Sequence, residues 1–174
     1  MKQTQVNIRP QDVVVLLKII ALGDQEWFHH TLADDIGISQ SEVTQSLNRS
    51  RYAGLIDDSR KKVMRMALLE FLIYGLRYAF PQQPGAIVRG IPTAHSAPPL
   101  NSIIVSSDNY VWPSGVGKIR GQAIVPLYPS VVEAIKNDKI LYELLALVDA
   151  IRVGRARERE IAKKELEKML LNGK

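Results

Sequence analysis

The chain has 174 residues, 46% of them hydrophobic, and a formal net charge of +5. This length and composition are typical of one globular domain, or of a small domain with an appendage. The lack of cysteine excludes a disulfide framework and a cysteine-based metal site. His29 and His30 are adjacent and cannot share one helix face, and His95 is remote, so we expect no metal site and no cofactor.

Hydropathy along the chain predicts no membrane span. The longest apolar stretch, residues 63–80, is interrupted by three charged side chains, so it is predicted to be a buried helix. Residues 1–9 are polar and do not have the pattern of a signal peptide. We therefore expect a cytoplasmic protein without a membrane partner.

In chain order, the first half is predicted to be helical, and residues 55–64 are predicted to form either a small two-stranded wing or a plain loop into the next helix. The predicted elements are helices 12–22, 28–36 and 39–52, strands 55–57 and 62–64, and a hydrophobic helix 65–80. Ser39 and Glu42 have the spacing of a capping box, in which each side chain satisfies an amide at a helix start. Gly37 tolerates the left-handed backbone that ends the second helix. The third helix is therefore predicted to start at Ser39.

The proline and glycine content rises after residue 80. Residues 81–129 hold eight of the nine prolines and five of the eleven glycines. The segment 81–128 is predicted to be an ordered run of loops and short strands, because it has too many apolar residues for disorder. Its strands are predicted at 102–106 and 122–125.

No motif in this middle segment predicts catalysis. Gly117-Lys118 is not the end of a Walker A loop, since Trp112 replaces the required glycine and Ile119 the required Ser or Thr. His95 has neither a nucleophile elbow nor a cysteine beside it, and is predicted to be a hydrogen-bonded loop residue. We expect no catalytic residue, and the chain is predicted not to be an enzyme.

The segment 129–174 is predicted to be helical, with an apolar stripe before Gly154 and a second apolar face after it. One small domain is not expected to bury both faces, so they are predicted to form a homodimer interface. Its residues are Leu144, Val148, Ile151, Ile161, Leu166, Met169 and Leu170. The alternative is a helical hairpin that folds back at Gly154 within one chain.

The pattern of the first third resembles the helix-turn-helix of bacterial transcriptional regulators, and most closely winged-helix regulators of the MarR type. The matching residues are Leu32-Ala33, Gly37-Ile38-Ser39, Val43 and Ala53-Gly54-Leu55-Ile56. The resemblance covers roughly residues 10–65. It implies a mainly α fold with a small β component: a winged helix-turn-helix in residues 1–80 and C-terminal helices for dimerisation. It also implies a homodimer that binds double-stranded DNA and regulates transcription.

The helix 39–52 is the predicted DNA reader, since Val43 and Leu47 are spaced to face inward and leave a polar outer face. The residues expected to contact base edges are Gln40, Ser41, Thr44, Gln45, Asn48 and Arg49. Those expected to contact phosphates are Ser39, Arg51, Arg60, Lys61 and Lys62. Residues 39–65 carry six basic and three acidic side chains, a net charge of +3 that favours a phosphate backbone.

Two other interpretations stay open. One is an interaction module, such as an antitoxin-like helix-turn-helix protein whose residues 81–174 bind a protein partner. The other is an enzyme built on residues 81–129. A DNA shift assay separates the regulator from the enzyme, and co-purification with a neighbouring gene product identifies the interaction module.

Overall fold

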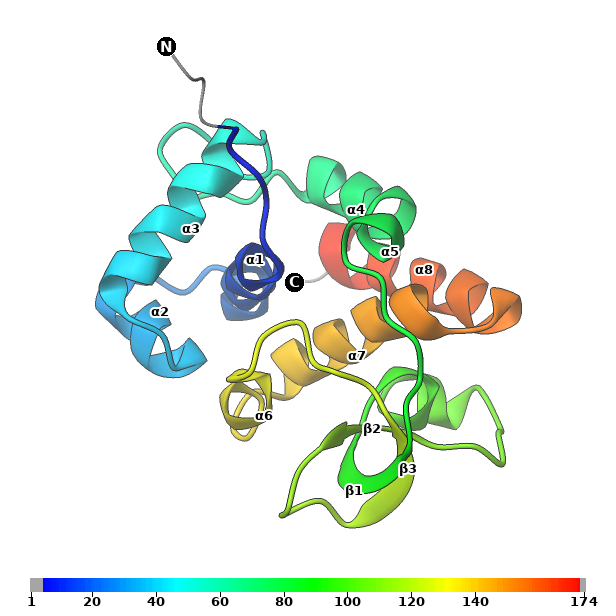
Figure 1. The fold of residues 1–174 in the computed structure, drawn as a ribbon. Helices are drawn as coiled ribbons and strands as arrows, with labels where there is room; N and C mark the ends of the chain where they lie inside the picture. Colours follow the sequence, from blue (N-terminus) through cyan, green and yellow to red (C-terminus); the bar gives the residue numbers. More distant parts are fainter. Residues whose placement is uncertain (1–4, 173–174) are drawn as a thin grey trace.

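The computed structural model describes residues 5–172, and it is mainly helical with one small sheet, as the sequence predicted. Figure 1 shows the chain from α1 to α8. The helices are α1 (Pro10–Leu22), α2 (His29–Ile36), α3 (Gln40–Tyr52), α4 (Arg65–Tyr74), α5 (Leu76–Ala79), α6 (Val131–Ala134), α7 (Lys139–Val153) and α8 (Ala156–Leu171). The strands are β1 (Ile87–Pro92), β2 (Tyr110–Pro113) and β3 (Ile119–Ala123), with the short 3₁₀ helices η1 (Ala94–Ser96) and η2 (Leu100–Ser102) between β1 and β2. Across residues 5–172, no helix is both long and apolar enough to cross a bilayer.

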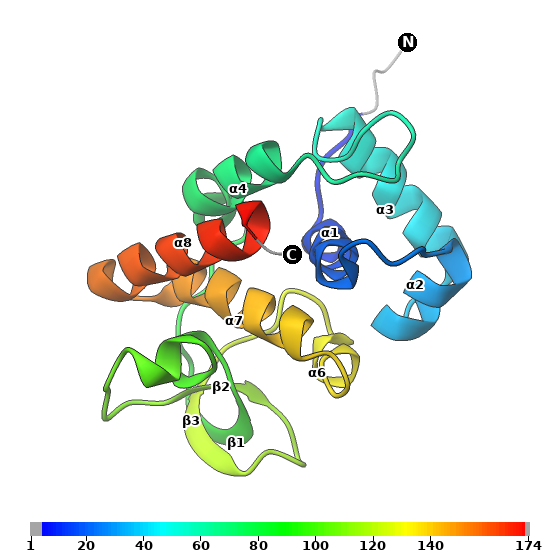
Figure 2. The same cartoon turned by 180° about the vertical axis from the view of Figure 1, so that it is seen from behind.

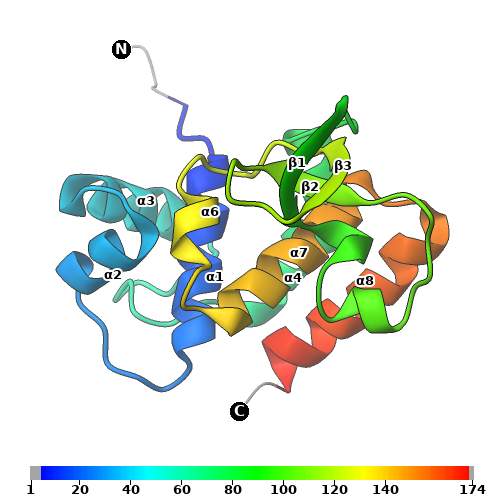
Figure 3. The same cartoon turned by 90° about the horizontal axis from the view of Figure 1, so that it is seen from below.

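Helix α7 lies at the centre of the fold, between α1 on one side and the sheet on the other (Figure 3). Ten of its fifteen residues are buried. Helix α1 is covered in the same way, since every residue from Gln11 to Ile20 is buried. One hydrophobic cluster therefore runs through the N-terminal helices, the sheet and the C-terminal helices.

The sheet has three strands that close on themselves. Strand β1 pairs antiparallel with both β2 and β3, and β2 pairs in parallel with β3. Such a small closed sheet brings backbones very close, and a Cβ on Gly90 would overlap the carbonyl group of Trp112. Gly90, Gly117 and Gly121 therefore allow the sheet to close, because a Cβ at each would overlap neighbouring backbone.

A buried acid attaches the sheet to α7. One carboxylate oxygen of Asp149 accepts hydrogen bonds from Thr93 Oγ1 at 2.8 Å and from Trp112 Nε1 at 2.6 Å. The other accepts from Arg152 Nη1 at 3.0 Å. Arg152 Nε also donates to the carbonyl oxygen of Phe80. Burial raises the pKa of the Asp149 carboxyl, against the opposing effect of Arg152.

The C-terminal helices form a hairpin within one chain, so the prediction that a second copy covers these apolar faces is wrong. Helix α8 folds back on α7 at Gly154, and α4 covers α8 while α1 covers α7 (Figure 2). Leu144, Val148, Ile151, Leu166 and Leu170 are all 0% exposed. Ile161 and Met169 are half-buried against the same core. The chain buries both apolar faces itself, because α1 packs on α7 and α4 packs on α8.

Three further elements differ from the sequence prediction. The helix expected at 65–80 is interrupted at Gly75, which separates α4 from α5. Residues 102–106 do not form a strand, since the 3₁₀ helix η2 ends at Ser102 and an exposed loop follows. The hairpin expected at 55–64 is present as a single antiparallel bridge between Ile56 and Val63.

The side chain of Tyr142 is expected to make the free energy of unfolding depend on pH in the alkaline range. Its hydroxyl donates to the carbonyl oxygen of Pro92 at 2.7 Å, and burial raises its pKa from 10.0 to about 12. Between these two pH values the unfolded chain loses the phenolic proton while the folded chain keeps it, so the free energy of unfolding falls as pH rises.

Tyr142→Phe is expected to lower the free energy of unfolding by about 1 kcal/mol near pH 7, because the hydrogen bond is lost. The difference between the variant and the parent should narrow above pH 10, as measured by urea unfolding at each pH. A difference that stays constant up to pH 12 would contradict this account.

Candidate nucleic-acid interface

The turn between α2 and α3 has the geometry that the sequence predicted. Gly37 ends α2 in the left-handed region, with φ 78° and ψ 41°. The Glu42 amide donates to Ser39 Oγ at 3.1 Å, and the Ser39 amide donates to Glu42 Oε2 at 2.8 Å. The bond from the Ser39 backbone is the main reason why the pKa of Glu42 is lowered. The predicted capping box and the helix start at Ser39 are confirmed.

Helix α3 presents a polar face to solvent along its whole length. Val43 and Leu47 are 0% exposed and hold the opposite face against the core. The exposed residues are Gln40, Ser41, Gln45, Asn48, Arg51 and Tyr52. The helix lies at the outer edge of the molecule, as Figures 1 and 2 show from opposite sides.

The hairpin that follows α3 extends this face. The Asp57 amide donates to the carbonyl oxygen of Lys62, and the Asp57 carboxylate accepts from the amides of Lys61 and Lys62. Arg60 occupies the turn with φ 59°. Its Nη1 donates to Asn48 Oδ1 at 2.8 Å, which joins the hairpin to the helix. We call the combined face the α3–hairpin surface; it comprises Gln40, Ser41, Gln45, Asn48, Arg51, Tyr52, Arg60 and Lys62.

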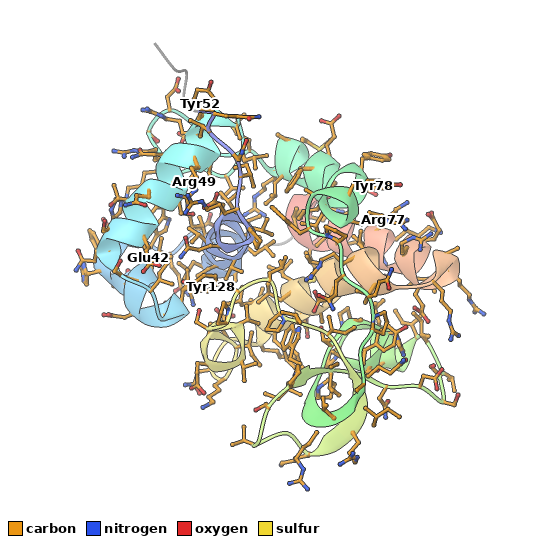
Figure 4. All side chains as sticks on the ribbon, viewed as in Figure 1. Glu42, Arg49, Tyr52, Arg77, Tyr78 and Tyr128 are labelled. Carbon is orange, nitrogen blue, oxygen red and sulfur yellow. The ribbon has the colours of Figure 1, made fainter. Side chains whose placement is uncertain are left out.

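Arg49 is not on this surface, so its prediction as a base-reading residue is wrong. Its guanidinium faces α1, where Nη2 and Nε donate to the two Asp12 carboxylate oxygens at 2.7 and 2.9 Å (Figure 4). The side chain of Asp12 is 0% exposed and that of Arg49 12%. A buried carboxylate needs a paired cation, and Arg49 supplies it.

Besides the Arg60–Asn48 pair, Gln45 Nε2 lies 3.4 Å from Ser41 Oγ. Three further predicted contact residues also have partners within the chain. Thr44 is half-buried, with its hydroxyl 3.0 Å from both the Gln40 carbonyl oxygen and His29 Nδ1. The Ser39 oxygen accepts the capping bond, which leaves its hydrogen available to donate. The ammonium of Lys61 donates to the Trp27 carbonyl oxygen and lies 4.1 Å from the centre of a Trp27 ring. Lys61 is exposed nonetheless, and its charge stays at the edge of the surface.

Cationic and acidic side chains both lie at this edge. Burial is the main cause that lowers the pKa of His29, and the charges of Lys61 and Arg60 lower it further. Asp57 faces the hairpin turn and its pKa is lowered, mainly by the hydroxyl of Ser59.

Tyr52 belongs to the surface but was absent from the predicted contacts. It is 74% exposed at the last turn of α3, and Figure 4 shows it at the hairpin end of the helix. The signal was present in the sequence, because Gln45, Asn48 and Tyr52 follow one another at helical spacing of three and four residues.

Hydrogen bonds hold α3 in place from its inner side. Glu42 Oε1 accepts from Gln11 Nε2 of α1 at 3.1 Å and from the Tyr128 hydroxyl, ahead of α6, at 3.3 Å. With the Arg49–Asp12 pair, these bonds fix the orientation of the helix relative to the core. The surface offers hydrogen-bond donors, acceptors and cations, which suit recognition. Within residues 5–172, no three His, Asp or Glu side chains are placed to hold a metal ion.

Comparison of the chain with protein-family models, with curated proteins and with solved structures gives no match.

Proposed function

We propose that the protein is a sequence-specific DNA-binding transcriptional regulator with a winged helix-turn-helix of the MarR-like type, and that α3 enters the major groove. The observation that carries this proposal is the α3–hairpin surface: an exposed polar helix face joined to a cationic hairpin through the Arg60–Asn48 bond. An α-helix with its side chains is about 10–12 Å wide, which fits the B-DNA major groove of about 12 Å.

The chemistry of the surface divides into base readers and phosphate contacts. Gln45 and Asn48 carry amides that pair with adenine, and both are exposed in the middle of α3. Arg51 and Lys62 are exposed at the hairpin end, where they would meet the backbone beside the groove. In this proposal the regulator acts in the cytoplasm on double-stranded DNA, as a homodimer.

The regulator is tested by separating sequence reading from phosphate binding. Specific sites are first selected from random duplexes. Gln45→Ala is expected to weaken binding to the selected site by about 1–3 kcal/mol and to leave a scrambled duplex unchanged. Lys62→Ala is expected to weaken both duplexes alike and to reduce the salt slope by about one charge. Both effects are read from fluorescence anisotropy at several salt concentrations.

Lys118→Ala is the matched control, because Lys118 is an exposed cation in the loop between β2 and β3, outside the α3–hairpin surface. Its binding should equal that of the parent. If the random pool yields no selected site, or if Gln45→Ala and Lys62→Ala bind like the parent, α3 does not read DNA.

The second candidate is an interaction module of the antitoxin-like kind that binds a protein through residues 81–174. It is favoured by the loop after η2, where Val105 is 101% and Ile103 46% exposed. Exposed apolar side chains that lie together are typical of protein contacts. Failure of DNA binding together with stable co-purification of one neighbouring gene product would favour this candidate.

A further inference from the structure

The outer face of the sheet carries two arginines that lie opposite each other. Strands β1 and β3 are antiparallel, and their register pairs Arg89 directly with Arg120. Both side chains are exposed, and they alternate along their strands with the buried Gly90 and Gly121. Like charges directly opposite one another destabilise a sheet. The protein alone therefore has electrostatic repulsion at this pair.

The chain supplies no acid to relieve this repulsion. The segment 81–128 has one acid, Asp108, against the three cations Arg89, Lys118 and Arg120. The carboxylate of Asp108 lies 3.5 Å from Nη2 of Arg155, just before α8. In the part of the chain that the structure describes, none of the three cations forms an ion pair with a carboxylate. An anion from outside the chain would remove the repulsion.

A groove of about 350 Å³ begins at the arginine pair. Arg120 lines it, together with Ile87 and Gln122, which form the neighbouring pair on the same face of the sheet. The loop before β2 supplies the opposite wall, with Ser107, Asp108 and Asn109. The groove thus joins a guanidinium to a hydroxyl group, two amides and one apolar side chain.

This combination of groups suits a phosphate that is attached to a sugar. A guanidinium donates two parallel N–H bonds to two oxygens of one phosphate, and the opposed positions of Arg89 and Arg120 allow both to reach the same group. The amides of Asn109 and Gln122 both donate and accept hydrogen bonds, as the hydroxyl groups of a sugar require. A few polar groups of this kind orient small ligands in their sites.

We propose that this face binds a small phosphorylated sugar or a nucleotide, with the phosphate between Arg89 and Arg120 and the sugar in the groove beside Asn109 and Gln122. The groove favours a small ligand over a DNA backbone, because it gives room to the uncharged part of that ligand. The inference goes beyond the proposed function: the sheet lies at the other end of the molecule from α3, and the site holds whether or not α3 reads DNA (Figures 1 and 3).

The test measures binding by calorimetric titration and by the amide shifts in NMR spectra, without DNA. The probes are adenosine monophosphate and the terminal phosphate esters of ribose and glucose. Each is compared with inorganic phosphate and with its own unphosphorylated form. At least one probe is expected to bind about 10-fold more tightly than either comparison compound, because only the probe contacts both the arginines and the groove. That probe should shift the amide signals of Arg120 and Gln122.

Three variants separate the two halves of the site. Arg89→Gln and Arg120→Gln should each weaken the bound probe roughly 10- to 100-fold, because each removes charge-assisted hydrogen bonds to the phosphate. Gln122→Ala should weaken the probe about 5-fold and leave the binding of inorganic phosphate unchanged, because Gln122 contacts the sugar alone.

Arg51→Gln is the matched control, since Arg51 is an exposed arginine on α3, and it should bind every probe like the parent. Circular dichroism checks that each variant is folded, and if one of them unfolds, the others still decide the question. Equal affinity for inorganic phosphate and for all three probes would indicate an adventitious ion only and overturn the proposal. It is also overturned if no probe binds, or if both arginine variants bind the probes like the parent. If the arginine variants weaken only the binding of duplex DNA, the pair contacts a DNA backbone and the proposal is wrong.

Discussion

Replacing Asp149 by alanine is expected to lower the free energy of unfolding by about 3–5 kcal/mol. The carboxylate is 1% exposed and is the common acceptor for Thr93, Trp112 and Arg152. Its removal leaves the guanidinium of Arg152, 8% exposed, without its counter-charge, and leaves the indole N–H of Trp112 without an acceptor. Since these groups join the sheet to α7, the loss should be visible as a lower urea midpoint in a single unfolding transition.

Two further variants separate charge from hydrogen bonding at this position. Asp149→Asn keeps an acceptor for the indole but removes the charge, so its loss should be smaller than that of alanine. Asp58→Ala removes an exposed carboxylate in the hairpin and should change stability by less than about 0.5 kcal/mol. A loss of less than about 1 kcal/mol for Asp149→Ala would show that the network does not hold the sheet to the helix.

Arg49→Ala is expected to affect stability and Arg51→Ala to affect DNA binding, although the two arginines are only two residues apart on α3. Arg49→Ala should lower the free energy of unfolding by about 3 kcal/mol, because it leaves the carboxylate of Asp12 buried without a cation. Arg51 is exposed, so Arg51→Ala should change stability by less than about 0.5 kcal/mol and instead weaken DNA binding.

Chemical denaturation and a salt series of DNA binding distinguish the two arginines. Arg49→Lys keeps the charge but loses the two-bond geometry, so its stability should fall between those of the parent and Arg49→Ala. If Arg49→Ala were as stable as the parent and lost DNA specificity, the original prediction of Arg49 as a base-reading residue would be restored.

Local signals predicted the first third of this fold well, because they act over a few residues. Ser39 and Glu42 satisfy each other's amides within one turn, and Gly37 adopts the left-handed backbone that its lack of a side chain allows. Neither feature depends on distant parts of the chain. The same holds for the inward spacing of Val43 and Leu47, which are both fully buried.

Features that depend on distant partners were not predictable from these patterns. Arg49 lies at the border between the buried and exposed faces of α3, and its direction is set by Asp12, 37 residues earlier. The apolar faces that contain Leu144 and Leu166 indicate that these side chains are buried. Helical spacing does not tell a covering helix of the same chain from one of a partner. Residues 102–106 have the composition of a strand, yet the closed sheet uses other segments whose glycines allow close approach.

The enclosure of α1 has a consequence for how the protein is divided experimentally. Every residue from Gln11 to Ile20 is buried, and α7, more than a hundred residues later, covers one side of that helix. A fragment ending at Phe80 would expose this apolar side to water. We therefore expect the N-terminal helices not to fold as an isolated fragment or as a fusion to another protein. We therefore expect the proposed reader and the C-terminal helices to fold and unfold as one cooperative unit, and a C-terminal truncation to remove part of the scaffold that orients α3.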